Sequence, residues 1–536
     1  MLLFYYIAIL TSIIGYGSFM NDKIIKYRTN NLGSIGLIGI FTLILISYVT
    51  SQFFAHTKIF NLFILILGIL FFLYFCNKKN YIFQNINLFI FMIFFMIIFI
   101  LIFKNHDDFH YYHFPYILML TEYPHPIGIG SLNIGFNTHS SIFFLASLFH
   151  LPGSNYSLFH LPATLCMFFA NLYLLNLIYN NKFYGKNRFI IFFSTASFVF
   201  INIFFYRLAE HGTDKSAMIL IVIFIIQILF ILNRKLEKDD FNQLVFIFIL
   251  LSLIISFKAL YILYLVFLIP IFYKLTREKD YLKLIVSNSF LLSSLLFLLV
   301  IFTNFLNSGC LLFPEAKTCF QKIPWGFSIE KIEEYKIHYE NWAKAGAGAG
   351  YTNIDKITYI KNFNWLSNWV DNYFFNKVSD FIFSLIFILI VLFLFFKRKI
   401  SISSQKIKYK SILFLNILLL FVWFFYHPAL RYGGYHLFFI LFFLPFSVFL
   451  QKYLENKKKF TKKITIIIII ASLIFFGRNV YRLSDENKKY MYNPFKDTKY
   501  RLTVKSFRYE NFISKLIQKN PEKIKELYNK KYIVRN

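Results

Sequence analysis

The chain has 536 residues, of which 58% are hydrophobic and 22% aromatic, and its mean hydropathy is +0.57. This composition excludes a soluble domain, and the long apolar runs do not alternate with polar residues as the strands of a β-barrel do. The formal net charge of +31 could indicate nucleic-acid binding, but the basic residues fall mainly between apolar runs. We therefore expect an all-α polytopic protein in a lipid bilayer, without a nucleic-acid partner.

The hydropathy pattern predicts about 14 transmembrane spans. The first lacks a basic start and a small-residue cleavage site, so we expect a retained helix and not a cleaved signal peptide. We predict spans at residues 2–20, 33–53, 58–76, 84–104, 156–179, 188–206, 214–232, 241–257, 259–273, 284–306, 380–396, 411–426, 432–450 and 464–477. The corresponding regions are N-terminal helices (1–104), a core (105–306) with a first outer loop (105–155), a large outer loop (307–379), C-terminal helices (380–477) and a basic tail (478–536).

Lysine and arginine are concentrated in alternate loops, which predicts that these loops face the cytoplasm. The same rule places four polar segments together on the opposite side: residues 105–155, 206–215, 307–379 and 426–432. The tail after Gly477 also lies outside, either along the membrane surface or in solvent. The apolar stretch 141–151 is too short to span, so we expect it to lie in the interface or to re-enter the membrane.

The first outer loop begins with the densest cluster of titratable groups outside the basic loops, Asn105 to His113. Asp107 and Asp108 follow a span directly, so either carboxylate could act as a general base or hold a divalent cation such as Mg²⁺ or Mn²⁺. A helix cap is an equally good explanation of the two aspartates. The nearby histidines raise the question of zinc, but the Cys and Glu ligands that usually complete such a site are missing from this segment.

Acidic residues recur in the next outer loop, at Glu210 and Asp214, on either side of His211. Two acidic outer loops point to a shared site more strongly than one. The turn 427–432 contributes His427 and Arg431, and an arginine there can pair with a phosphate. Lys258, between two spans, could do the same, although snorkelling to lipid head groups is the simpler explanation.

The large outer loop carries two cysteines and several tryptophans. Cys310 and Cys319 enclose eight residues, so a disulfide is expected in an oxidising compartment, with free thiols as the alternative. Trp325, like Trp342, Trp365 and Trp369, could stack on a sugar or anchor at the interface.

Taken together, these residues resemble the GT-C superfamily of membrane glycosyltransferases, and most of all an uncharacterised bacterial family of multi-pass membrane proteins. The resemblance extends from about residue 80 to 485, although four spans precede the acidic loop here, whereas GT-C enzymes place it after the first helix. It is carried by Asp108-x-x-x-Tyr112-His113, Gly128-x-Gly130-x-Leu132 with Gly135-Phe136-Asn137, Ser308-Gly309-x-Leu311-x-x-Pro314, Trp325, Trp342-Ala343, His427-Pro428-x-x-Arg431-Tyr432 and Gly477-Arg478-Asn479.

The resemblance implies an enzyme of a bacterial inner membrane that transfers a sugar from a polyprenyl-phosphate carrier to an envelope glycan or lipid on the periplasmic side. Asp108 would be the general base or metal ligand, with Asp107 in reserve, and Glu210 and Asp214 would orient the acceptor or metal. The substrate-binding residues would be His113, Tyr112, His211, Lys258, Trp325, His427 and Arg431. Two other functions remain open: a polymerase or ligase of lipid-linked polysaccharide, and a transporter or flippase.

Overall fold

The computed structural model describes residues 1–76, 78, 86–106, 108–154, 156–180, 188–210, 212–233, 241–278, 287–351, 355–396, 407–452 and 456–491. Within these ranges the protein is helical, without a β-strand. The helices are α1 (Leu2–Met20), α2 (Leu32–Ser51), α3 (Lys58–Cys76), α5 (Ile86–Met96), α6 (Phe114–Glu122), α7 (Ser141–Ser147), α8 (Leu161–Ile178), α9 (Arg188–Phe204), α10 (Thr213–Leu232), α11 (Phe241–Phe257), α12 (Ile269–Glu278), α14 (Asn288–Ser308), α15 (Ile329–Lys344), α16 (Lys356–Ile360), α17 (Leu366–Trp369), α18 (Ser379–Phe396), α19 (Lys410–Tyr426), α20 (Gly434–Leu450) and α21 (Lys457–Tyr490).

Nine helical segments in the described ranges are long and apolar enough to cross a membrane, and five shorter apolar helices accompany them. The shorter helices are Ile86–Ile100, Arg188–Phe204, Leu244–Phe257, Lys410–Tyr426 and Gly434–Leu450. Each of the 14 expected spans coincides with one of these segments. The class of polytopic helical membrane protein is therefore confirmed, whereas the number of crossings stays a prediction.

Helix starts follow local sequence. The side chains of Asn31, Ser287, Ser328 and Asn456 each accept a hydrogen bond from a backbone N–H in the first turn of α2, α14, α15 and α21. These caps satisfy N–H groups that have no partner inside the helix. The last helix does not end near Gly477 but continues to Tyr490, so the first part of the predicted tail extends α21 beyond its apolar stretch.

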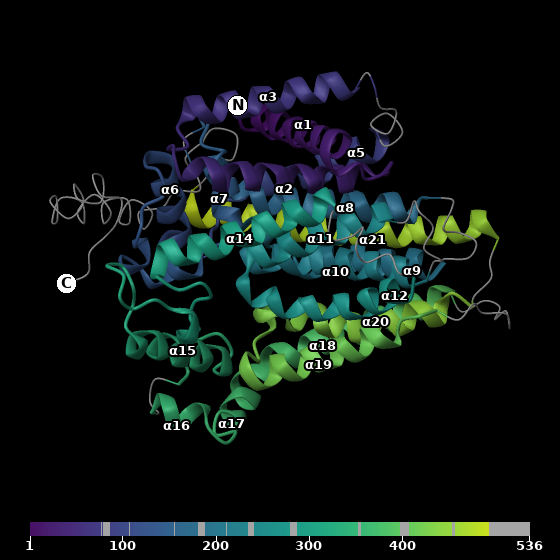
Figure 1. Cartoon of the computed structure of the whole chain (residues 1–536). Coiled ribbons are helices and arrows are strands. Elements are labelled where there is room, and N and C mark those ends of the chain that lie inside the picture. Colours follow the sequence, from purple (N-terminus) through teal and green to yellow (C-terminus); the bar gives the residue numbers. More distant parts are fainter. Residues whose placement is uncertain are drawn as a thin grey trace.

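The helices form a layered bundle in which α8 and α10 are central (Figure 1). On one side α8 contacts α2, which packs on α1, and α1 packs on α3; on the other side α9 joins α8 to α20 and α21. The central helices are almost entirely enclosed. In the apolar stretch of α10, 94% of the residues are buried, whereas in that of the segment 366–396 only 22% are. Outer helices instead expose large apolar side chains such as Phe63, Phe383 and Phe387, which suits contact with lipid and not with water.

The two ends of the bundle differ in chemistry. At one end, Lys274 Nζ donates to Ile231 O over 2.7 Å and Asn233 exchanges hydrogen bonds with the backbone of Lys408. At the other end lie the outer-loop helices α15, α16 and α17, beyond the ends of the long helices (Figure 1). The segments expected on the outer side thus gather at one end of the molecule, which brings their polar residues within reach of one another.

The apolar stretch 141–151, predicted to lie in the interface or to re-enter the membrane, contains α7, which is enclosed by protein. The interface alternative is therefore wrong, whereas re-entry into the membrane stays a prediction. All seven residues of α7 are buried, and the helix packs against α2, α6 and α8. The Ser47 hydroxyl donates to Phe144 O over 2.6 Å, and the Ser141 and Ser256 hydroxyls lie 2.7 Å apart. Protein side chains therefore cover this short helix on all sides, so it has no face for lipid.

Close approach of α1 and α2 depends on glycine. A Cβ added at Gly39 would lie 2.0 Å from Ile13 O, and one at Gly17 would lie 2.0 Å from Ile35 O. Small residues permit this backbone contact, which is a common way for helices to associate in a membrane. A methyl group at either position would force the two helices apart.

We expect Gly39→Ala to lower the melting temperature of the detergent-solubilised protein, at a cost of about 1–3 kcal/mol from overpacking. Gly477→Ala is the matched control, because nothing lies within 4 Å of its added Cβ. Thermal unfolding followed by size-exclusion chromatography measures both. An equal melting temperature for Gly39→Ala and the wild type would contradict the close contact.

Candidate functional site

Asp108, Asp214, Lys258 and Arg431 meet at the end of the bundle that carries α15, α16 and α17, which we call the outer end after its predicted side of the membrane. Asp108 stands at the start of the π-helical turn Phe109–His113, and its side chain makes no capping hydrogen bond. Asp214 lies in the first turn of α10, Lys258 between α11 and the 3-10 segment Ala259–Leu268, and Arg431 in the 3-10 turn Leu430–Tyr432. The helix-cap explanation of Asp108 is therefore wrong, and its carboxylate is available for other contacts.

The Arg431 guanidinium joins the two aspartates. Its Nη2 lies 3.2 Å from Asp108 Oδ2, and its Nε lies 3.4 Å from Asp214 Oδ2. Lys258 Nζ lies 3.0 Å from the other oxygen, Asp214 Oδ1, and His106 Nδ1 lies 3.3 Å from Asp108 Oδ2. Side chains from four separate segments thus form one continuous chain of charges.

The cluster lies beside two tyrosine rings. Lys258 Nζ and the Arg431 guanidinium approach the Tyr432 ring to 5.9 and 5.4 Å from its centroid. Burial, and next the charges of Asp108 and Asp214, raise the pKa of Tyr112 well above its usual value, so this phenol stays neutral. The surroundings are polar but largely enclosed, because the Asp214 side chain is only 11% exposed whereas Asp108 and Arg431 are 29% and 31% exposed.

The ionisation of the cluster follows from these contacts. Burial by itself would raise the pKa of Asp108, but the hydrogen bond and charge of His106, followed by the charge of Arg431, hold it well below its usual value. Burial would lower the pKa of Arg431, but Asp214, Tyr432 and Asp108 together raise it further above its ordinary range. Asp108 and Arg431 therefore both carry their charges at neutral pH, and the resting cluster neutralises itself.

The large outer loop holds the turn that carries Arg431. The indole Nε1 of Trp369 donates to Pro428 O over 2.6 Å, and the Leu430 N–H donates to the Tyr373 hydroxyl over 2.8 Å. From α19, Trp423 Nε1 donates to Ala429 O over 2.9 Å. The backbone groups of residues 428–430, directly before Arg431, are thus each held by an aromatic side chain. Two of these side chains, Trp369 and Tyr373, belong to the large outer loop.

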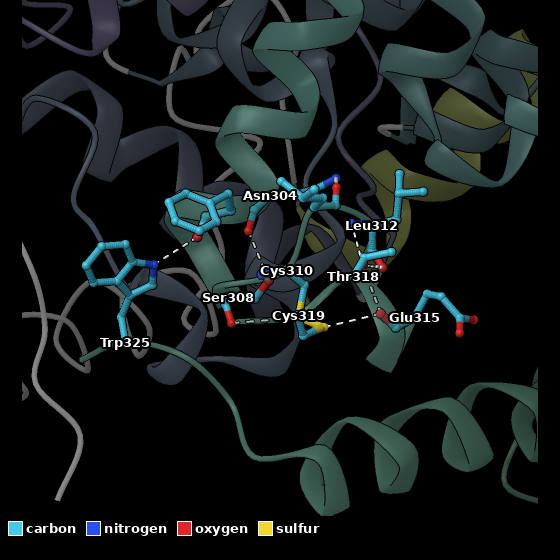
Figure 2. Close-up of a disulfide and its surroundings, with 10 residues drawn as sticks. Asn304, Ser308, Cys310, Leu312, Glu315, Thr318, Cys319 and Trp325 are labelled. Atoms are coloured by element: carbon cyan, nitrogen blue, oxygen red, sulfur yellow. Dashed lines mark hydrogen bonds between the residues drawn. A yellow bond between two sulfur atoms is a disulfide. The ribbon is translucent and has the colours of Figure 1, made fainter. Parts of the chain in front are cut away.

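At its start the outer loop is stapled by a disulfide between Cys310 and Cys319 (Figure 2). The Ser308 hydroxyl donates to Asn304 O, and the Thr318 hydroxyl donates to Glu315 O, both over 2.9 Å. The Trp325 indole donates to Phe305 O at the end of α14 over 2.9 Å (Figure 2). Trp325 therefore serves the structure of the loop base, where its ring packs edge-on against Phe305.

The remaining predicted residues take different places. His113 is buried, and the ring centroids of His427 and Tyr432 lie 6.0 Å apart. Glu210 belongs to a second group of charges, in which Arg207 Nη2 lies 2.7 Å and Arg482 Nη2 2.5 Å from its Oε1. Only its backbone reaches toward the first cluster, where Glu210 O accepts from the His106 N–H over 3.0 Å. Asp107 and His211 lie outside the described residues.

A divalent cation does not fit this arrangement. Asp108 Oδ2 and both oxygens of Asp214 already face cationic side chains, and the positive charges of Arg431 and Lys258 would repel a metal ion. Among the described residues no group of three or more His, Cys, Asp or Glu side chains could hold a metal. The arrangement suits an anion instead, because a phosphate could replace either carboxylate at Arg431.

Comparison with known proteins gives one family. A family model described as "Domain of unknown function (DUF8201)" matches residues 1–439. The chain belongs to the DUF8201 family. No curated protein and no solved structure matches it. The DUF8201 match includes Asp108, Asp214, Lys258 and Arg431, and it ends within α20, before α21 begins.

Sequence reasoning missed Tyr373 and the part that Trp369 plays in positioning Arg431. Trp369 and Tyr373 are four apart, which places both on one face of a helix, and this spacing within a polar loop was the available signal. The sequence connects His106 only with a possible zinc site, and for Lys258 it leaves open a phosphate partner or lipid head groups. The contact between Lys258 and Asp214 depends on how α10 and α11 pack against each other.

We expect Tyr373→Phe to loosen the turn 427–432, because the buried Leu430 N–H loses its acceptor at a cost of about 1–3 kcal/mol. Hydrogen–deuterium exchange of peptides covering this turn should be faster than in the wild type. Tyr351→Phe is the control, since that hydroxyl contacts His338 Nδ1 elsewhere in the outer loop. Unchanged exchange at the turn would show that Tyr373 does not hold it.

The stability of this region should also depend on pH through His427. Burial lowers the pKa of His427 to about 4, below its usual value of 6.5. The unfolded chain therefore binds more protons between pH 6.5 and 4, and stability falls as the pH falls through this range. We expect His427→Gln to show a smaller drop in melting temperature between pH 7 and pH 5 than the wild type. An unchanged drop would contradict a buried, neutral His427.

Proposed function

We propose that this protein is a membrane glycosyltransferase that takes a sugar from a polyprenyl-phosphate carrier and transfers it to an envelope glycan or lipid. The observation that carries the proposal is the Arg431 guanidinium held between Asp108 and Asp214 at the outer end of the bundle. A site for this reaction needs a cation for the leaving phosphate beside a carboxylate for the acceptor hydroxyl. The proposed location is the periplasmic face of a bacterial inner membrane.

In the proposed reaction the acceptor hydroxyl oxygen attacks the anomeric carbon of the sugar. The bond between that carbon and the carrier phosphate oxygen breaks, and the phosphate leaves with the electron pair. Arg431 and Lys258 stabilise the charge on the phosphate, and Asp108 accepts the hydroxyl proton. No metal is required, because these two side chains supply the positive charge that a divalent cation would otherwise provide.

The low pKa of Asp108 makes it a weak base in the resting protein. A phosphate bound at Arg431 would compete with Asp108 for the guanidinium and would add a negative charge close by. Both effects raise the pKa of Asp108 toward its usual value. Donor binding would thus convert Asp108 from a counter-ion of Arg431 into a better proton acceptor. Asp214, which also faces Lys258, would remain in place to orient the two cations.

A second candidate is a polymerase or ligase of lipid-linked polysaccharide, centred on Arg431 and His427. The contacts of Asp108 and Asp214 favour this alternative to a degree, because they give both carboxylates a role as counter-ions without any proton transfer. The two functions differ in what they require of Asp108. A transferase needs Asp108 as the proton acceptor, so Asp108→Asn would remove its activity. In the polymerase or ligase Asp108 is one of two counter-ions of Arg431, and Asp214 still pairs with Arg431 when Asp108 is replaced.

The test is the envelope glycan profile of the source strain carrying the wild type, a deletion, Asp108→Asn or Arg431→Gln. We expect both substitutions to remove the same sugar as the deletion, with a loss of at least about 100-fold for each. Asp371→Asn, an exposed aspartate in the outer loop, is the control and should leave the profile unchanged. Immunoblots of membrane fractions establish that all variants are present at equal levels.

The pattern of losses separates the candidates. Loss of the sugar in Arg431→Gln but not in Asp108→Asn would move the assignment to the polymerase or ligase. A profile unchanged by the deletion itself would contradict an enzyme of envelope glycans altogether.

A further inference from the structure

A groove lined by basic and aromatic residues lies along the extension of α21, next to the turn 206–210. Five positive side chains line it: Lys104, Arg207, Arg478, Arg482 and Lys489. Two carboxylates, Asp485 and Glu486, are the acidic members of the lining. Even with Glu210 counted behind the groove, positive groups outnumber negative ones.

One of the two carboxylates of the groove, Glu486, is committed to the fold, whereas Asp485 is exposed. Glu486 Oε2 accepts hydrogen bonds from the Phe103 and Lys104 N–H groups over 2.7 and 3.1 Å. Its other oxygen lies 3.1 Å from Arg482 Nε. Glu486 is only 2% exposed, so it anchors α21 to the backbone of residues 103–104 and offers no surface charge. The positive groups at the rim therefore have no equal set of exposed carboxylates.

Arg482 provides a second, independent observation. Its side chain is 10% exposed, and it pairs with both Glu210 and Glu486. Its Nη1 is nevertheless buried without a hydrogen-bond partner in the described part of the chain. Because protein covers this nitrogen, Arg482 acts on the groove through its positive charge and not through a direct hydrogen bond.

The groove opens where the lipid-facing surface of α21 ends. Ile469, Leu473, Phe476 and Val480 are exposed at helical spacing and form a continuous apolar stripe along α21. The stripe leads directly to Tyr481, which lines the groove and is 78% exposed. Tyrosine and arginine at the end of an apolar stripe are typical of the membrane–water boundary.

We propose that this groove binds the phosphate of an anionic lipid head group. The acyl chains would lie along the exposed stripe of α21, and the phosphate would accept hydrogen bonds from the exposed cations at the rim. The proposal is independent of the transfer reaction, since it concerns binding at α21 and not at Arg431. The basic segment after residue 491 is a poor occupant, because its lysines and arginines carry the same sign of charge as the groove.

The test uses the full chain in neutral detergent and native mass spectrometry with added phosphatidylglycerol or phosphatidylcholine. We expect the wild type to retain phosphatidylglycerol in preference, and Lys104→Gln/Lys489→Gln to lower its affinity for that lipid by about 10-fold. Both lysines are exposed, so this double variant should fold. Arg482→Gln, with its folding checked by melting temperature, should lower the affinity at least as much.

Lys331→Gln/Lys336→Gln in α15 removes the same charge from exposed positions of the outer loop and should bind as the wild type does. Equal retention of phosphatidylcholine, or equal affinities of the groove variant and this control, would overturn the proposal. Inorganic phosphate that displaces the lipid at equal concentration would overturn the lipid assignment and show a site for free phosphate instead.

Discussion

The contact on which the outer end of this protein depends is the Arg431 guanidinium between two aspartates. It joins residues 323 positions apart in the chain and requires the first outer loop, α10 and the turn after α19 to arrive together. A largely enclosed charge is tolerated only when it is paired, and removing one partner costs more than the pair contributes. The position of Arg431 is therefore strongly constrained, as the proposed phosphate-binding role requires.

The large outer loop holds this arrangement from outside the bundle. The disulfide closes its first turn, α15 follows, and the buried Lys344 pairs with Glu340 at 2.6 Å and lies 5.4 Å from the centroid of Trp365. Trp369 and Tyr373 come next and hold the turn before Arg431. The large outer loop is thus a scaffold for the turn that carries Arg431. Changes within it would act on Arg431 through the backbone of residues 428–430.

A second group of charges lies next to the first and has a different task. Glu210 and Glu486 tie α21 to the loops after α9 and α5, through Arg207, Arg482 and two backbone N–H groups. Because Glu210 O also accepts from His106, the two groups share one piece of backbone. Glu210 is therefore a structural carboxylate with an influence on the site, although its sequence position resembles that of Asp214.

Much of this architecture follows from the sequence alone. The apolar runs determined the helices, since a backbone in lipid must satisfy its own hydrogen bonds, and the alternation of basic loops grouped the polar segments at one end. Asp108, Asp214 and Arg431 could be named as candidates because charged residues at the ends of spans are few. The sequence could not show which charged residues pair with one another. Arg431 lies between the two aspartates, and Lys258 contacts Asp214 and not lipid. Glu210 pairs with Arg207 and Arg482 instead. These choices depend on how helices far apart in the chain pack, because an ion pair needs its atoms within a few ångströms and only tertiary structure sets such distances.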